Sequence, residues 1–227
     1  MLKRQSNLTD QAYDLISQKI IKTIYKPGSR ISEKIIAADL KIGRTPIREA
    51  LLRLRQEQLI DIIPQSGTYI SKIDLKAVRD AGFVRTSIEQ EIMKQAAEIT
   101  MSDSERISLE INLQNQDKAM TIEDLNLFLD LDNEFHHFFY QLTNHEEVWS
   151  WIKTINVQFD RYRFLSLIVN QLSLNELITD HENILKSVLK NDVKQVAQFT
   201  KRHLERALEE EKSVIAEFPD YFTNTNI

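Results

Sequence analysis

The sequence predicts a mainly α-helical protein, with an N-terminal helical unit that carries a small β-hairpin and a C-terminal, all-α helical bundle. Three of the four Pro and three of the four Gly lie before residue 75, so the long remainder contains few helix breakers. Apolar residues recur there three and four positions apart, which is the spacing of helices with one buried face. The 227 residues, 42% of them hydrophobic, suffice for two modest domains.

The net charge of −5 conceals an asymmetry between the two ends of the chain. Residues 1–74 contain 13 Lys and Arg against 8 Asp and Glu, whereas residues 75–227 contain 16 against 26. A basic segment joined to an acidic body indicates that only the first segment contacts a polyanion such as DNA. The acidic composition of the whole chain therefore does not argue against DNA binding.

The N-terminus lacks the apolar run of a signal peptide, and no stretch reaches the roughly 18 apolar residues of a membrane span. The chain has no Cys, which excludes disulfides and thiolate chemistry. We therefore expect a cytoplasmic protein without a membrane partner.

Two short helices joined by a tight turn are predicted within residues 31–55. Ser32 can cap the first helix, and the turn that follows contains a glycine. Thr45 can cap the second helix, and Pro46 suits its first helical position. On the second helix, an apolar face is formed by Ile47, Leu51 and Leu54. A cationic face is formed by Arg44, Arg48 and Arg55. Such a helix suits the major groove of DNA, although an isolated Arg-rich helix is more often simply solvated.

Two β-like runs, 59–63 and 68–71, follow this helix and predict a hairpin wing, because the turn sequence P-Q-S-G separates them. The motifs R-T-P-I-R-E-A-L-x-R-L, E-x-L-I and P-x-x-G-T-Y-I resemble the winged helix-turn-helix domain of the GntR family of bacterial transcription regulators. Two positions depart from the family pattern. Gly43 stands where Ser is more frequent, and Gln58 stands where Gly is usual.

This resemblance implies a homodimer that binds a two-fold symmetric, double-stranded DNA operator, with one recognition helix in each major groove. It assigns DNA contacts to Arg44, Thr45 and Arg48 on that helix and to Lys34 on the preceding helix. Gly67, in the turn of the wing, would permit close approach to the minor groove.

The second domain is expected to cover residues 75–227, after a winged helix-turn-helix domain at 1–74. Its helices are predicted at about 75–100, 103–119, 122–143, 145–170, 173–190 and 192–217. The last residues, from Pro219 onward, are expected to form a frayed tail.

A carboxylate and three histidines from three of these helices are candidates for one metal site. Asp132 and His136 are four residues apart and share a helix face, while His181 and His203 lie in the last two helices. Imidazole and carboxylate ligands suit Zn²⁺, Ni²⁺, Mn²⁺ or Fe²⁺. On spacing alone, an Asp–His pair is more often a surface hydrogen bond and a lone His more often a core residue.

The motifs D-x-x-F-H, H-x-x-I-L and R-H-L resemble the FCD-type C-terminal domain of the FadR subfamily. The resemblance implies that Asp132, His136, His181 and His203 bind a divalent metal ion beside a small-molecule effector, an organic acid in many members. It also points to Arg85, which would bind an anionic effector or brace the domain interface. A surface ion pair between Arg85 and Glu89 explains the same residues equally well.

Besides a repressor or another ligand-controlled regulator, two alternative functions are compatible with parts of the sequence. Three His and an Asp could activate water in a metal-dependent enzyme, yet the chain has no H-E-x-x-H motif, nucleophile elbow or phosphate loop. The other reading is an architectural DNA-binding protein without an effector. We therefore expect a regulator rather than an enzyme.

Overall fold

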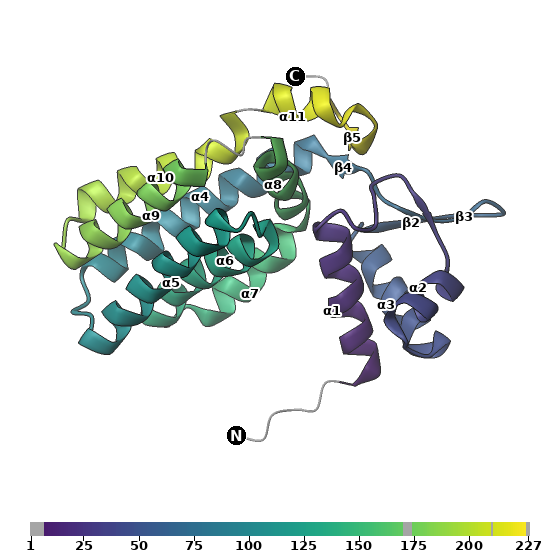
Figure 1. Ribbon diagram of the computed structural model, residues 1–227, viewed down its shortest axis with the longest axis horizontal. Helices are drawn as coiled ribbons and strands as arrows, with labels where there is room; N and C mark the ends of the chain where they lie inside the picture. The colour runs from purple at the N-terminus through teal and green to yellow at the C-terminus, as the bar shows by residue number, and fades with distance from the viewer. Residues whose placement is uncertain (1–6, 170–173, 210, 226–227) are drawn as a thin grey trace. The chain divides into compact units, whose positions relative to one another are not determined.

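The computed structural model describes residues 7–169, 174–209 and 211–225 and divides the chain into two compact units (Figure 1). One unit comprises Met1–Leu75 together with Phe218–Ile227, and the other comprises Lys76–Glu217. The first combines short helices with small sheets, and the described elements of the second are helices joined by short turns. The predicted fold class is confirmed.

The N-terminal unit is built on three helices, α1 (Leu8–Ile21), α2 (Glu33–Leu40) and α3 (Arg44–Gln56). Their apolar faces meet in one core, whose fully buried side chains include Ala12, Ile16, Ile20, Ile36, Ile47 and Leu54. Ser32 caps α2 as predicted, by accepting a hydrogen bond from the amide of Ile35. The prediction that Thr45 caps α3 is wrong, because the extended backbone ends at Gly43, which is the N-cap and offers no side-chain oxygen.

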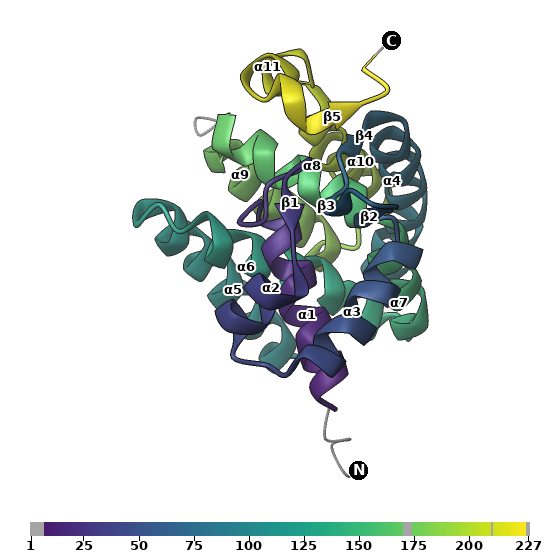
Figure 2. The same ribbon diagram turned by 90° about the vertical axis from the view of Figure 1, so that its right-hand side faces the viewer.

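The predicted wing is formed by β2 (Ile60–Ile63) and β3 (Gly67–Ile70), which pair antiparallel. A further strand, β1 (Arg30–Ile31), pairs with the other edge of β3, so the strand order is β1-β3-β2 (Figure 2). The sequence did not reveal β1, because two residues are too short to show an alternating pattern.

Gln58, between α3 and β2, has a left-handed backbone with φ of 59°. This conformation costs a residue with a Cβ atom about 1–2 kcal/mol, whereas Gly adopts it freely but has about 0.5–1 kcal/mol more conformational entropy to lose. We expect Gln58→Gly to raise the free energy of unfolding by up to about 1 kcal/mol, measured by urea denaturation.

Gln56→Gly is the matched control for this prediction, because Gln56 is the exposed last residue of α3 and has no left-handed backbone to relieve. It should lower stability by up to about 1 kcal/mol. Destabilisation by both substitutions would show that the backbone at position 58 is not strained.

Residues 219–225 are ordered rather than frayed, contrary to expectation, and residues 226–227 lie outside the described part of the chain. A 3₁₀ turn (Pro219–Tyr221) leads into β5 (Phe222–Thr223), which pairs in parallel with β4 (Ile73–Asp74) in the same unit. Phe222 is buried, and the side-chain amide of Asn224 donates a 2.9 Å hydrogen bond to Asp74. Burial of the Phe222 ring anchors this tail.

The helical unit consists, in its described part, of elements that cover the predicted ranges. They are α4 (Leu75–Ala97), α5 (Asp103–Thr121), α6 (Leu125–Leu142), α7 (Glu146–Ile155), α8 (Val157–Val169), α9 (Leu174–Leu189), α10 (Val193–Glu209) and α11 (Glu211–Glu217). The helix predicted at 145–170 is two helices, because the chain turns at Asn156, a weak helix former. Within the described residues, no helix is both long enough and apolar enough to cross a membrane.

One hydrophobic core holds α4, α5, α6, α7, α9 and α10 together. Phe135 and Phe139 of α6 belong to this core together with Met93 of α4 and Ile184 of α9. Asp132 and His136 flank Phe135 on α6, so the packing of this helix carries polar side chains into the interior of the unit.

Candidate metal centre and DNA-binding surface

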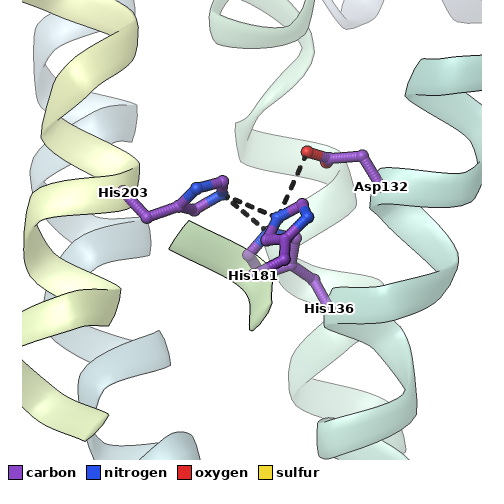
Figure 3. Close-up of side chains that lie close together, drawn as sticks. All are labelled: Asp132, His136, His181 and His203. Carbon is purple, nitrogen blue, oxygen red and sulfur yellow. Dashed lines mark hydrogen bonds and ion pairs between the residues drawn. The ribbon is translucent and has the colours of Figure 1, made fainter. Parts of the chain in front are cut away.

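The four predicted metal ligands lie together in the interior of the helical unit (Figure 3). Asp132 and His136 come from α6, His181 from α9 and His203 from α10. All four are buried, and one ligand atom of each lies within 4.8 Å of the others. The structure thus brings together residues that are up to 71 positions apart in the chain.

The distances between the imidazole nitrogens match those of ligands that share one cation. Nε2 of His203 lies 3.1 Å from Nε2 of His136 and 3.1 Å from Nε2 of His181. Nitrogens that bind one metal at about 2.1 Å are separated by roughly 3.0–3.4 Å for bond angles of about 90–110°. Oδ1 of Asp132 completes the set, 3.7 Å from Nε2 of His181.

In two of the rings, the neighbour of Nδ1 selects which ring nitrogen carries the proton in the neutral imidazole. Nδ1 of His136 lies 2.7 Å from Oε2 of Glu89, and Nδ1 of His181 lies 2.8 Å from Oε1 of Gln116. An oxygen acceptor at Nδ1 places the ring proton there, so Nε2 carries a lone pair. The lone pairs of both rings therefore point at one another and at His203, an arrangement that a bound cation would stabilise.

The electrostatics of the cluster keep Asp132, His181 and His203 in their metal-binding forms. Burial lowers the pKa of His181 to about 3 and the pKa of His203 well below its ordinary value, so both rings are neutral at neutral pH. Burial disfavours the charged form of Asp132, but the Arg163 guanidinium, 2.7 Å away, holds the pKa of this carboxyl well below its usual range. Asp132 is therefore a carboxylate.

A cavity of about 110 Å³ lies beside the cluster, and Asp132, His203, Arg85 and Arg163 line it. In the described part of the chain, Nη2 of Arg85 and Nε of Arg163 are buried without a hydrogen-bond partner. Two buried guanidinium groups with open donors favour an anion in this cavity.

The predicted ion pair between Arg85 and Glu89 is formed, but it is buried rather than on the surface. Nε of Arg85 donates to Oε1 of Glu89 at 2.6 Å, and both side chains are fully enclosed. Arg85 therefore pairs with Glu89 and also lines the cavity.

The predicted DNA contacts lie on exposed positions of the N-terminal unit. Arg44, Thr45 and Arg48 occupy the first turns of α3, and Lys34 is exposed on α2. Among the described residues, neither Arg44 nor Arg48 forms an ion pair. Because Gly43 leaves the first amides of α3 without a side-chain cap, these amides can bind phosphate.

Gly67 has a second role that the sequence did not suggest. Its φ is 137°, and a Cβ atom at this position would lie 2.8 Å from Nε of Arg30. Gly67 therefore leaves room for the Arg30 side chain, which lies across the end of the wing.

Comparison with known proteins identifies both units. The family model "Bacterial regulatory proteins, gntR family" matches residues 8–70, and the model "FCD domain" matches residues 80–206. The chain belongs to the GntR family. Its FCD domain fits the FadR subfamily, as the motifs around Asp132 and His181 predicted.

Relatives of this GntR-family chain are regulators of transcription. It is 30% identical over 217 residues to the HTH-type transcriptional repressor RspR of Escherichia coli K12, covering 95% of this chain and 94% of RspR. It is 27% identical over 191 residues to the Nta operon transcriptional regulator of Aminobacter aminovorans, covering 84% and 88% of the two chains. This GntR-family protein is therefore a transcription regulator with an effector-binding FCD domain, not an enzyme.

Solved structures confirm the fold of the GntR-family chain. The structure of E. coli McbR/YncC superposes with a TM-score of 0.79 at 19% identity, covering 94% of this chain and 100% of that one. A transcriptional regulator GntR from Rhodococcus sp. RHA1 gives a TM-score of 0.72 at 19% identity, with the same coverage of 94% and 100%.

Proposed function

We propose that this regulator binds a two-fold symmetric operator as a homodimer in the cytoplasm and that a small anionic effector with a carboxylate group controls its affinity for DNA. The observation that carries the effector assignment is the pair of buried guanidinium groups, Arg85 and Arg163, which face a cavity beside three converging imidazoles. Binding of an effector there would shift the chain between states of different operator affinity.

Asp132, His136, His181 and His203 would hold one divalent cation, for which Zn²⁺, Ni²⁺, Mn²⁺ and Fe²⁺ suit this set of nitrogen and oxygen ligands. When bound, the ion supplies positive charge and coordination positions for an anionic ligand. The converging lone pairs and the 3.1 Å separations of the imidazole nitrogens support this assignment.

The charges of the enclosed side chains support an anionic effector. Arg85 pairs with Glu89, and Arg163 pairs with Asp132, so these four groups balance one another without the cation. A divalent cation would add positive charge in a buried setting, where unpaired charge is costly. An anionic ligand compensates that charge and can also accept hydrogen bonds from Arg85 and Arg163.

On DNA, Arg44, Thr45 and Arg48 would contact bases and phosphates from the major groove, with Lys34 on the backbone. The wing, whose tip contains Gly67, would lie along the minor groove. The exposure of these side chains and of the α3 N-terminus supports this arrangement.

A thermal-shift screen of organic acids, with and without a metal chelator, tests the effector proposal. We expect the matching acid to raise the melting temperature, because a ligand at one hundred times its dissociation constant stabilises the folded state by about 2.7 kcal/mol. The chelator should abolish this shift, and the corresponding neutral amide should give none. Equal shifts with amide and acid would contradict an anionic effector, and DNA affinity unaffected by every stabilising acid would favour an architectural protein.

A further inference from the structure

Glu89 contacts both parts of the buried polar centre, although it was not among the predicted ligands. Its carboxylate is fully enclosed within the helical unit. Oε1 accepts a 2.6 Å hydrogen bond from Nε of Arg85, and Oε2 lies 2.7 Å from Nδ1 of His136. One carboxylate thus connects a side chain that lines the cavity with a side chain of the histidine cluster.

We propose that Glu89 is a positioning residue of the metal centre, which directs Nε2 of His136 at the cation and holds Arg85 with Nη2 open to the cavity. This inference rests on the proposed metal site and adds the residue that links cation and anion binding. An acceptor at Nδ1 selects the tautomer of His136 and the orientation of its ring. The hydrogen bond from Arg85 Nε to the other oxygen restricts rotation of the guanidinium.

The Nδ1 atoms of the three imidazoles have different neighbours. Of these neighbours, Glu89 should interact most strongly with its ring. His181 contacts the neutral amide of Gln116, whose own NH₂ group donates to Asn112 at 2.7 Å. Nδ1 of His203 is buried and, among the described residues, forms neither a hydrogen bond nor an ion pair, whereas Nδ1 of His136 lies 2.7 Å from Oε2 of Glu89, a close contact whose angles are not those of a hydrogen bond. A carboxylate polarises an imidazole more strongly than an amide does, so His136 should be the ligand most dependent on its outer partner.

A purely structural role does not account for this arrangement. A buried ion pair contributes little net stability, because desolvation of both charges offsets their attraction, and an apolar pair of similar volume often serves a core as well. Stability of α4 therefore does not require Glu89, whereas orientation of His136 does require an acceptor at this point.

The test compares Co²⁺ affinity of the full chain, measured by chelator competition, between wild type and Glu89→Gln. We expect Glu89→Gln to weaken Co²⁺ binding by about 10- to 100-fold. The matched control is Glu91→Gln on the same helix, because Glu91 is exposed and pairs only at the surface with Lys94. Its Co²⁺ affinity should stay within about twofold of wild type.

A second variant and a second readout cover the case in which Glu89→Gln leaves Arg85 unpaired and does not fold. Arg85→Met combined with Glu89→Leu removes both charges and should fold while still losing Co²⁺ affinity. In the metal-free protein, ¹⁵N chemical shifts should report a single Nδ1-protonated tautomer of His136 for wild type and a mixture for the double variant.

The outcomes separate this inference from the proposed metal site. Wild-type Co²⁺ affinity in the variants, or an unchanged His136 tautomer, would overturn the role of Glu89 and leave the metal site standing. Absence of Co²⁺ binding by the wild type would refute the metal site itself, and the role of Glu89 with it.

Discussion

Arg48→Ala is expected to weaken specific operator binding by about 10-fold or more, because a bidentate contact between Arg and guanine is worth about 1–3 kcal/mol of discrimination. Arg48 lies on the exposed face of α3, whereas Ile47 and Leu51 hold the helix in its core. Loss of an exposed side chain that has no ion-pair partner among the described residues should change stability by less than about 0.5 kcal/mol. Fluorescence polarisation with duplexes from the protein's own promoter, at one fixed salt concentration, measures the effect.

Arg55→Ala is the matched control, since Arg55 is exposed in the last turn of the same helix. Both substitutions remove one positive charge, so both should weaken binding to a duplex of random sequence to a similar, small extent. Only Arg48→Ala should also reduce the ratio of specific to nonspecific affinity. Specific affinity that survives Arg48→Ala would refute the assignment of α3 as the recognition helix.

The fold was predictable where a long pattern of apolar residues was compatible with only one type of secondary structure. The stripe through Ile47, Leu51 and Leu54 predicted α3 and its buried face, and the scarcity of helix breakers predicted the helical unit. The errors have two different sources. The start of α3 depends on the backbone angles of Gly43, and the ordered C-terminus depends on the burial of Phe222, neither of which local spacing encodes.

The candidate metal cluster was only partly predictable from spacing. The four-residue interval between Asp132 and His136 placed them on one helix face, but the approach of His181 and His203 depends on how α9 and α10 pack. Gln116 and Arg163, which contact His181 and Asp132, could not be predicted from the sequence. A polar residue on a helix is expected to be exposed, and only the tertiary structure shows that it is buried. Glu89 was visible as a neighbour of Arg85, but its contact with His136 was not.

His181→Ala is expected to abolish metal binding, because it removes one of four ligands from a fully buried site. Protein purified without added metal should contain about one divalent ion per wild-type chain and almost none per variant chain. His137→Ala is the control, since His137 lies outside the cluster and contacts Glu146 at the surface. Equal and negligible metal in wild type and His181→Ala would count against the site.

Thermal stability separates loss of the ion from loss of the side chain in the His181→Ala variant. A metal at one hundred times its dissociation constant stabilises the wild type by about 2.7 kcal/mol, and a chelator should remove that contribution. The truncated ring also leaves a cavity beside Phe135, which stacks on His181 with ring centroids 4.4 Å apart, and this cost persists in chelator. The metal contribution is therefore the chelator-sensitive part of the stability difference. It should be present in wild type and His137→Ala and absent from His181→Ala, whatever the packing cost of the substitution.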